Sequence, residues 1–130
     1  MNYRVLGKTG YKISEVSLGT WQLSCRWGEP FNDQEADRTL NAAYDAGINF
    51  IDTADLYNDG NSEKAIGRFL KGKQDKVFVA TKLGREIRPV TAESYTKENL
   101  TRYVEQSLKR MDLEVLDLIQ FHTPDRKSVV

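Results

Sequence analysis

The sequence predicts an α/β fold built around a parallel sheet. Short apolar segments rich in β-branched residues alternate with longer amphipathic segments, and the pattern strand, helix, strand repeats three times. The composition is that of a globular protein, with 39% hydrophobic and 29% charged residues. A length of 130 residues allows one domain, so residues 1–130 are expected to form a single unit.

Capping residues and glycines mark the ends of several expected elements. A small β-hairpin should come first, over residues 4–13, because two apolar segments flank glycines there. The four strand candidates are Glu15–Thr20, Ile48–Asp52, Val77–Lys82 and Leu116–His122. The three helix candidates, each with an apolar stripe, are Asp33–Ala46, Ser62–Leu70 and Lys97–Met111. Their expected N-caps are Asn32, Asn61 and Thr96, and Gly47 should end the first helix.

Charge and composition argue against several classes of protein. The 19 basic residues balance 19 acidic ones, so no overall field attracts nucleic acid or an anionic membrane. Apolar runs are too short to span a bilayer, and the N-terminus lacks the apolar core of a signal peptide. A single cysteine, Cys25, excludes an internal disulfide and a cysteine-based zinc cage. We therefore expect a cytoplasmic chain with no metal, nucleic-acid or membrane partner.

An ionisable residue closes each of the last three predicted strands. These residues are Asp52, Lys82 and His122, separated by 30 and 40 residues, or one βα unit each. The carboxyl ends of neighbouring parallel strands meet at one rim, where α/β barrels and open α/β sheets place their sites. Strand alternation also puts the three side chains on the same face. Tyr57, in the loop after Asp52, is close enough in sequence to reach over this rim.

Taken singly, these residues have ordinary explanations as a turn former, a loop lysine, a structural histidine and a packing tyrosine. Their joint placement predicts more. A tyrosine hydroxyl donates a proton poorly near neutral pH, but a nearby ammonium favours the phenolate. A carboxylate can orient that ammonium, and a histidine can hydrogen-bond a substrate oxygen. The set suits protonation of a carbonyl that accepts hydride, and a cofactor must supply the hydride.

Several motifs in the same order resemble the aldo-keto reductase family. The matching segments are residues 3–10, 18–21, 46–57, 61–63, 66–67, 79–82 and 117–125. They include Leu18-Gly19-Thr20-Trp21, Ile51-Asp52-Thr53-Ala54-Asp55-Leu56-Tyr57 and Gln120-Phe121-His122-Thr123-Pro124-Asp125. The opening motif looks most like the branch that also contains the β subunits of voltage-gated potassium channels.

The resemblance implies a (β/α)8 TIM barrel with the hairpin over its bottom. It also implies NAD(P)H-dependent reduction of a small aldehyde or ketone to an alcohol, with NADPH expected and NADH as the alternative. Tyr57 would be the general acid, Lys82 and Asp52 would ease its loss of the proton, and His122 would orient the carbonyl. Gly19, Thr20, Trp21 and Asp52 would contact the cofactor near the mouth of the barrel.

The length departs from this pattern, because a full barrel needs eight βα units and about 250 residues. Only the hairpin and about four βα units are expected here, which makes a half-barrel that looks truncated. Its open edges should favour self-association. The alternative function is therefore a non-catalytic, regulatory or partner-binding half-barrel. A flavodoxin-like binding domain suits the length, but Gly19-Thr20-Trp21 lacks the glycine-rich phosphate loop of that class.

Overall fold

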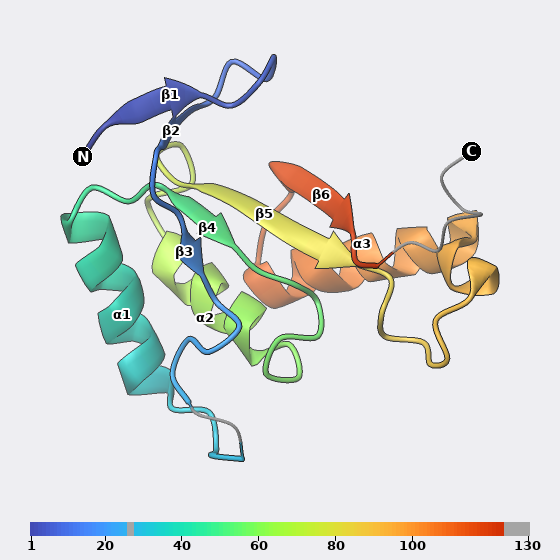
Figure 1. Cartoon of the computed structure of the whole chain (residues 1–130). Helices are drawn as coiled ribbons and strands as arrows, with labels where there is room; N and C mark the ends of the chain where they lie inside the picture. Colours follow the sequence, from blue (N-terminus) through green and yellow to red (C-terminus); the bar gives the residue numbers. More distant parts are fainter. Residues whose placement is uncertain (26–27, 124–130) are drawn as a thin grey trace.

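The structure, a computed structural model, describes residues 1–25 and 28–123. Its centre is a parallel sheet in the order β3-β4-β5-β6, which is also the order along the chain (Figure 1). The strands are β3 (Leu18–Gly19), β4 (Phe50–Asp52), β5 (Phe78–Leu83) and β6 (Leu118–Phe121). The connecting helices are α1 (Asp33–Asp45), α2 (Asn61–Leu70) and α3 (Lys97–Met111). The expected parallel α/β architecture is confirmed. Pro124 and Asp125 of the matched motif lie outside the described residues.

The register of the sheet fixes which side chains share a face. Gly19 pairs with Asp52, Asp52 with Ala80, and Lys82 with Gln120. Successive side chains of a strand point to opposite faces, so Asp52 and Lys82 share the face that lies away from the helices. The intervening Ile51, Val79 and Thr81 are buried on the helix side.

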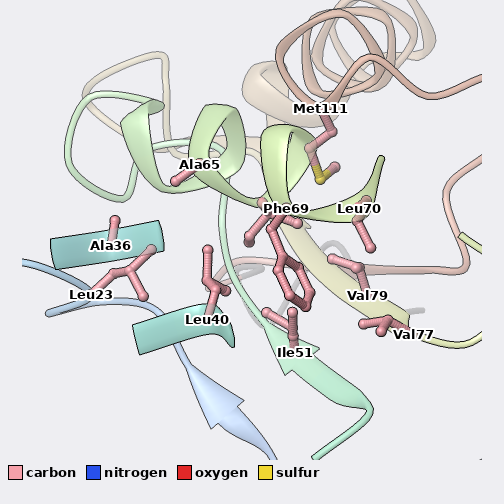
Figure 2. Packing of buried hydrophobic residues seen from close by; sticks show 11 residues of the cluster. Leu23, Ala36, Leu40, Ile51, Ala65, Phe69, Leu70, Val77, Val79 and Met111 are labelled. Carbon is pink, nitrogen blue, oxygen red and sulfur yellow. The ribbon is translucent and has the colours of Figure 1, made fainter. Parts of the chain in front are cut away.

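The hydrophobic core lies between the sheet and the three helices (Figure 2). It is formed by Leu23, Ala36, Leu40, Ile51, Ala65, Ile66, Phe69, Leu70, Val77, Val79 and Met111. Helices α2 and α3 are in close contact at Gly67, where a Cβ would lie 2.5 Å from the Met111 carbonyl oxygen. A glycine is therefore required there by the packing of two helices rather than by a turn.

Two of the three expected helix N-caps are confirmed. Asn32 Oδ1 accepts the Glu35 N–H at 3.1 Å, and Thr96 Oγ1 accepts the Asn99 N–H at 3.3 Å. Gly47, with φ of +91°, ends α1 as expected. The prediction for α2 is wrong, because Asn61 is its first helical residue and the N-cap is Gly60, a left-handed residue without a side chain.

The expected N-terminal hairpin is present as antiparallel β1 (Tyr3–Val5) and β2 (Lys12–Ser14). It lies beyond the ends at which the parallel strands begin (Figure 1). The Tyr11 ring stacks on Phe78 at 4.4 Å between centroids, and Asn49 Oδ1 accepts the Ser14 N–H at 2.7 Å. These contacts cover the amino-terminal end of the sheet, as a barrel bottom requires.

Two features differ from the expected boundaries. The first parallel strand is short, because the Glu15 N–H bonds to the Asn2 carbonyl and so belongs to the hairpin. A 3-10 helix, η1 (Ala92–Tyr95), precedes α3 and was not expected. None of the helices in the described ranges is long and apolar enough to cross a membrane.

Candidate active site

Asp52 and Lys82 form an ion pair at the carboxyl-terminal rim of the sheet. Lys82 Nζ lies 2.5 Å from Asp52 Oδ1 and also donates to the Thr53 carbonyl at 3.1 Å. The Lys82 side chain is 19% exposed and that of Asp52 is 37% exposed. The carboxylate and carbonyl together hold the ammonium in one position on the open face of the sheet.

Tyr57 lies against this ion pair. Lys82 Nζ lies 5.4 Å from the centroid of the Tyr57 ring, so the ammonium faces the aromatic π-system. The loop after Tyr57 bends sharply because Asn58, Asp59 and Gly60 all have positive φ. This bend leads straight into α2 and keeps Tyr57 at the rim, where the side chain is largely buried.

His122 completes the group from the end of β6. Its ring lies edge-on to Tyr57, with 6.0 Å between centroids. The His122 N–H donates to the Leu83 carbonyl at 2.8 Å, which continues the β5–β6 ladder, and Tyr95 Oη donates to the His122 carbonyl. Burial lowers the pKa of His122, and the positive charges of Arg85 and Lys82 lower it further, while Asp52 raises it. A neutral imidazole at pH 7 follows.

The predicted cofactor residues sit where β3 ends, and they differ in exposure. Gly19 is exposed, and a Cβ there would meet nothing within 4 Å. Thr20 is fully buried and donates its hydroxyl to the Asp52 carbonyl at 3.1 Å. Trp21 is exposed and packs edge-on against Tyr57 at 5.2 Å. The structure therefore brings Trp21 to Tyr57, while the Thr20 side chain binds the backbone of the rim at Asp52.

Sequence reasoning gave no role to a buried polar network that lies beneath the rim. Glu63 in α2 is fully buried, accepts the Thr81 hydroxyl at 2.6 Å and pairs with Arg110 of α3 at 2.5 Å. Asp55 is also buried, and its Oδ2 accepts the Gly84 N–H at 3.3 Å. Burial and then the nearby Glu63 charge raise the pKa of Asp55 to about 6. This network ties the Tyr57 loop, β5 and α3 together.

A pocket of about 470 Å³ opens beside Tyr57. Tyr57 and Trp21 line it, together with Leu56, Cys25 and two arginines of the loop after β5. Cys25 Sγ donates to Asn58 Oδ1 at 3.3 Å, which joins the two loops of the pocket wall.

The side chains present fit the reacting end of a nicotinamide cofactor and a carbonyl oxygen. His122 Nδ1 is buried and has no hydrogen-bond partner in the described part of the chain. A buried polar atom without a partner is costly, so a ligand atom at this point would be favoured. No cluster of three or more potential metal-ligating residues occurs in the described ranges.

The chain is similar to proteins of one known family. The model of the Aldo/keto reductase family matches residues 15–130. The aldo-keto reductase YhdN of Bacillus subtilis is 37% identical over 96% of this chain and 39% of its own length. The probable voltage-gated potassium channel subunit beta of Oryza sativa is 30% identical over the whole chain and 40% of its own length. The chain thus spans about 40% of the length of these curated relatives.

Solved structures give the same match. The aldo-keto reductase AKR11C1 of Bacillus halodurans, in its holo form, superposes with a TM-score of 0.84 at 29% identity, over 99% of this chain and 42% of its own. An aldo-keto reductase of Klebsiella pneumoniae in complex with NADPH superposes with a TM-score of 0.72 at 27% identity, over 89% of this chain and 37% of its own. The expected half-barrel of the TIM-barrel class is confirmed.

Proposed function

Because the chain belongs to the aldo/keto reductase family, we propose that it carries the catalytic part of an NADPH-dependent reductase of aldehydes or ketones. The single observation that supports this most is the convergence of Asp52, Lys82, Tyr57 and His122 at one rim. We also propose the cytoplasmic location expected from the sequence. NADH remains the alternative cofactor.

Each side chain has a role that follows from its contacts. The bound cofactor supplies the hydride. The Tyr57 hydroxyl donates its proton to the carbonyl oxygen, and the Lys82 ammonium, 5.4 Å from the ring centroid, stabilises the phenolate that remains. Asp52 holds that ammonium in place. The neutral His122 imidazole binds the same oxygen and orients it.

The first experiment tests the reaction itself. The 130-residue chain is mixed with NADPH and 4-nitrobenzaldehyde, and loss of NADPH absorbance is followed. Tyr57→Phe should lower kcat by at least about 100-fold, which is the usual contribution of a general acid, and should leave NADPH affinity nearly unchanged. Tyr11→Phe is the matched control, because Tyr11 stacks on Phe78 at the opposite end of the sheet. Turnover that survives Tyr57→Phe would contradict the assigned role.

An open sheet supports a second candidate, a half-barrel that binds a partner. Strands β3 and β6 are the two edges of the sheet, and Val115, Ile119 and Phe121 near β6 are exposed. Unpaired edges with apolar side chains favour pairing with another chain. We propose that copies of the 130-residue chain associate through these edges. Absence of both NADPH binding and turnover would favour this function over catalysis by the chain alone.

The association is tested by sedimentation velocity over a range of concentrations. Ile119→Lys places a charge on the β6 edge and should shift the chain toward monomer. Val5→Lys is the control, because Val5 is also exposed but lies in the separate hairpin sheet. A wild-type chain that stays monomeric at every concentration would overturn the proposed association.

A further inference from the structure

Two arginines of the loop after β5 line the pocket beside Tyr57. Arg85 and Arg88 form part of its wall, together with Trp21 and Leu56. The ion pairs of the described residues involve Arg4, Arg38, Arg68 and Arg110, and the Arg102 guanidinium lies over the Tyr103 ring. Neither Arg85 nor Arg88 has a carboxylate partner within these ranges. Two guanidinium groups are therefore available at the entrance to the site.

The charge of the pocket favours an anion. Among the described residues that line it, only Glu29 is acidic, so two guanidinium groups against one carboxylate give these residues a formal charge of +1. The field of Arg85 also reaches the reacting centre, because after burial it is the strongest influence lowering the pKa of His122.

The rest of the pocket favours an apolar body. Trp21, Leu56 and Tyr57 present two aromatic rings and an aliphatic side chain. A volume of about 470 Å³ is within the range of pockets that hold small organic ligands. The formal charge of +1 matches a single negative charge, and a guanidinium binds a carboxylate through two parallel hydrogen bonds.

We propose that the carbonyl substrate carries a carboxylate, which Arg85 and Arg88 bind while its apolar part lies against Trp21. This inference rests on the proposed reductase function and names its substrate class. The arginines are specificity residues, since they hold the substrate at a distance from the carbonyl that reacts. Neutral aldehydes enter the same pocket but leave both guanidinium groups without a partner.

The first test needs no turnover. Benzoate and its neutral analogue benzamide are titrated into the chain, and the His122 imidazole signals are followed by NMR. His122 is the only histidine of the chain, so these signals are unambiguous. Benzoate should bind at least about tenfold more tightly, as expected for a hydrogen bond to a charged group. Equal affinity for the two ligands, or binding of neither, would overturn the inference.

The variants Arg85→Gln and Arg88→Gln should each remove most of the preference for benzoate. Arg102→Gln is the matched control, because Arg102 lies on α3 over Tyr103 and away from the pocket. Arg85→Gln should also raise the pKa of His122, because it removes a nearby positive charge. A preference for benzoate that persists in both arginine variants would contradict the assigned residues.

The second test separates this inference from the proposed function. The chain is assayed with NADPH on 4-formylbenzoate and 4-formylbenzamide. We expect a lower KM for the carboxylate, and Arg85→Gln should raise that KM without changing the KM of the amide. Reduction of both with equal KM would leave the reductase function standing and overturn the substrate class. Preferred binding of benzoate without any reduction would support the anion site and contradict the reductase function.

Discussion

Asp55 and Gly84 join the loop that carries Tyr57 to the end of the strand that carries Lys82. The Gly84 N–H donates to Asp55 Oδ2 at 3.3 Å, and the Asp55 N–H donates to the Lys82 carbonyl at 3.0 Å. Asp55 is therefore bonded through both its backbone and its side chain to the segment that begins at Lys82. The distance between the proposed acid and its ammonium depends on this connection.

Asp55→Asn should stabilise the chain at neutral pH more than at acidic pH. The pKa of Asp55 rises from 3.8 in the unfolded chain to about 6 in the folded one. Below pH 3.8 both states are protonated and burial has no charge penalty. Between pH 3.8 and about 6 the unfolded chain loses this proton while the folded chain keeps it, so a penalty grows that reaches at most about 3 kcal/mol above pH 6. Asparagine can still accept the Gly84 N–H, so that hydrogen bond is kept.

Urea unfolding of wild type and Asp55→Asn at pH 4 and pH 7.5 measures this effect. The unfolding free energy of Asp55→Asn minus that of wild type should be about 1 to 3 kcal/mol larger at pH 7.5 than at pH 4. If the difference in unfolding free energy is the same at both pH values, folding does not raise the pKa of Asp55. The comparison of differences cancels the acid sensitivity of the other carboxylates, because both proteins share them.

Glu63→Gln should destabilise the chain by about 3 kcal/mol. The glutamine oxygen can still accept the Thr81 hydroxyl, but its amide cannot accept from Arg110, which loses its charge partner. Loss of one member of a buried ion pair is costly for this reason. Glu35→Gln is the control, because Glu35 pairs with Arg38 on the exposed surface of α1 and should cost less than about 1 kcal/mol. If Glu63→Gln and Glu35→Gln lower the free energy of unfolding in urea by the same amount, burial does not strengthen the Glu63–Arg110 pair.

Gly67→Ala should destabilise the chain although alanine is the better helix former. Helix propensity alone would favour alanine by about 1 kcal/mol. The new Cβ would lie 2.5 Å from the Met111 carbonyl oxygen, so α2 and α3 must separate, and we expect a net loss of about 1 to 3 kcal/mol. Lys64→Ala, on the exposed side of the same helix, should change the unfolding free energy little. A variant with a higher Tm than wild type would show that the two helices can move apart without cost.

The parts of the site that the sequence predicted follow from regular strand geometry. Asp52 ends β4, Lys82 is the last but one residue of β5, and His122 directly follows β6, so only the first of these strands ends where the sequence predicted. The parallel register still brings these positions to one rim regardless of loop details. Tyr57 was expected at the rim, but its approach depends on three consecutive left-handed residues, 58–60. Only one of them is glycine, so the bend has little signature in the sequence. The same bend makes Gly60, rather than Asn61, the N-cap of α2.

The buried network could not be predicted because its members come from separate elements. Glu63, Thr81 and Arg110 lie on α2, β5 and α3, and each alone reads as an ordinary polar residue of its element. Local periodicity gives no information on which side chains meet across helices. Arg85 and Arg88 were likewise missed, since only the folded loop brings them to the pocket that Tyr57 lines.

The two members of the Asp52–Lys82 ion pair should shift the pKa of His122 in opposite directions. The Lys82 ammonium lowers that pKa and the Asp52 carboxylate raises it, although burial has the largest effect. Lys82→Met should therefore raise the pKa of His122, and Asp52→Asn should lower it. NMR titration of the single imidazole measures both without any turnover. Lys64→Met is the control, because Lys64 lies on the exposed side of α2, and it should leave the titration unchanged. If the pKa of His122 shifts in the same direction in both variants, His122 responds to a change in its burial. That result would contradict an electrostatic interaction of His122 with Lys82 and Asp52.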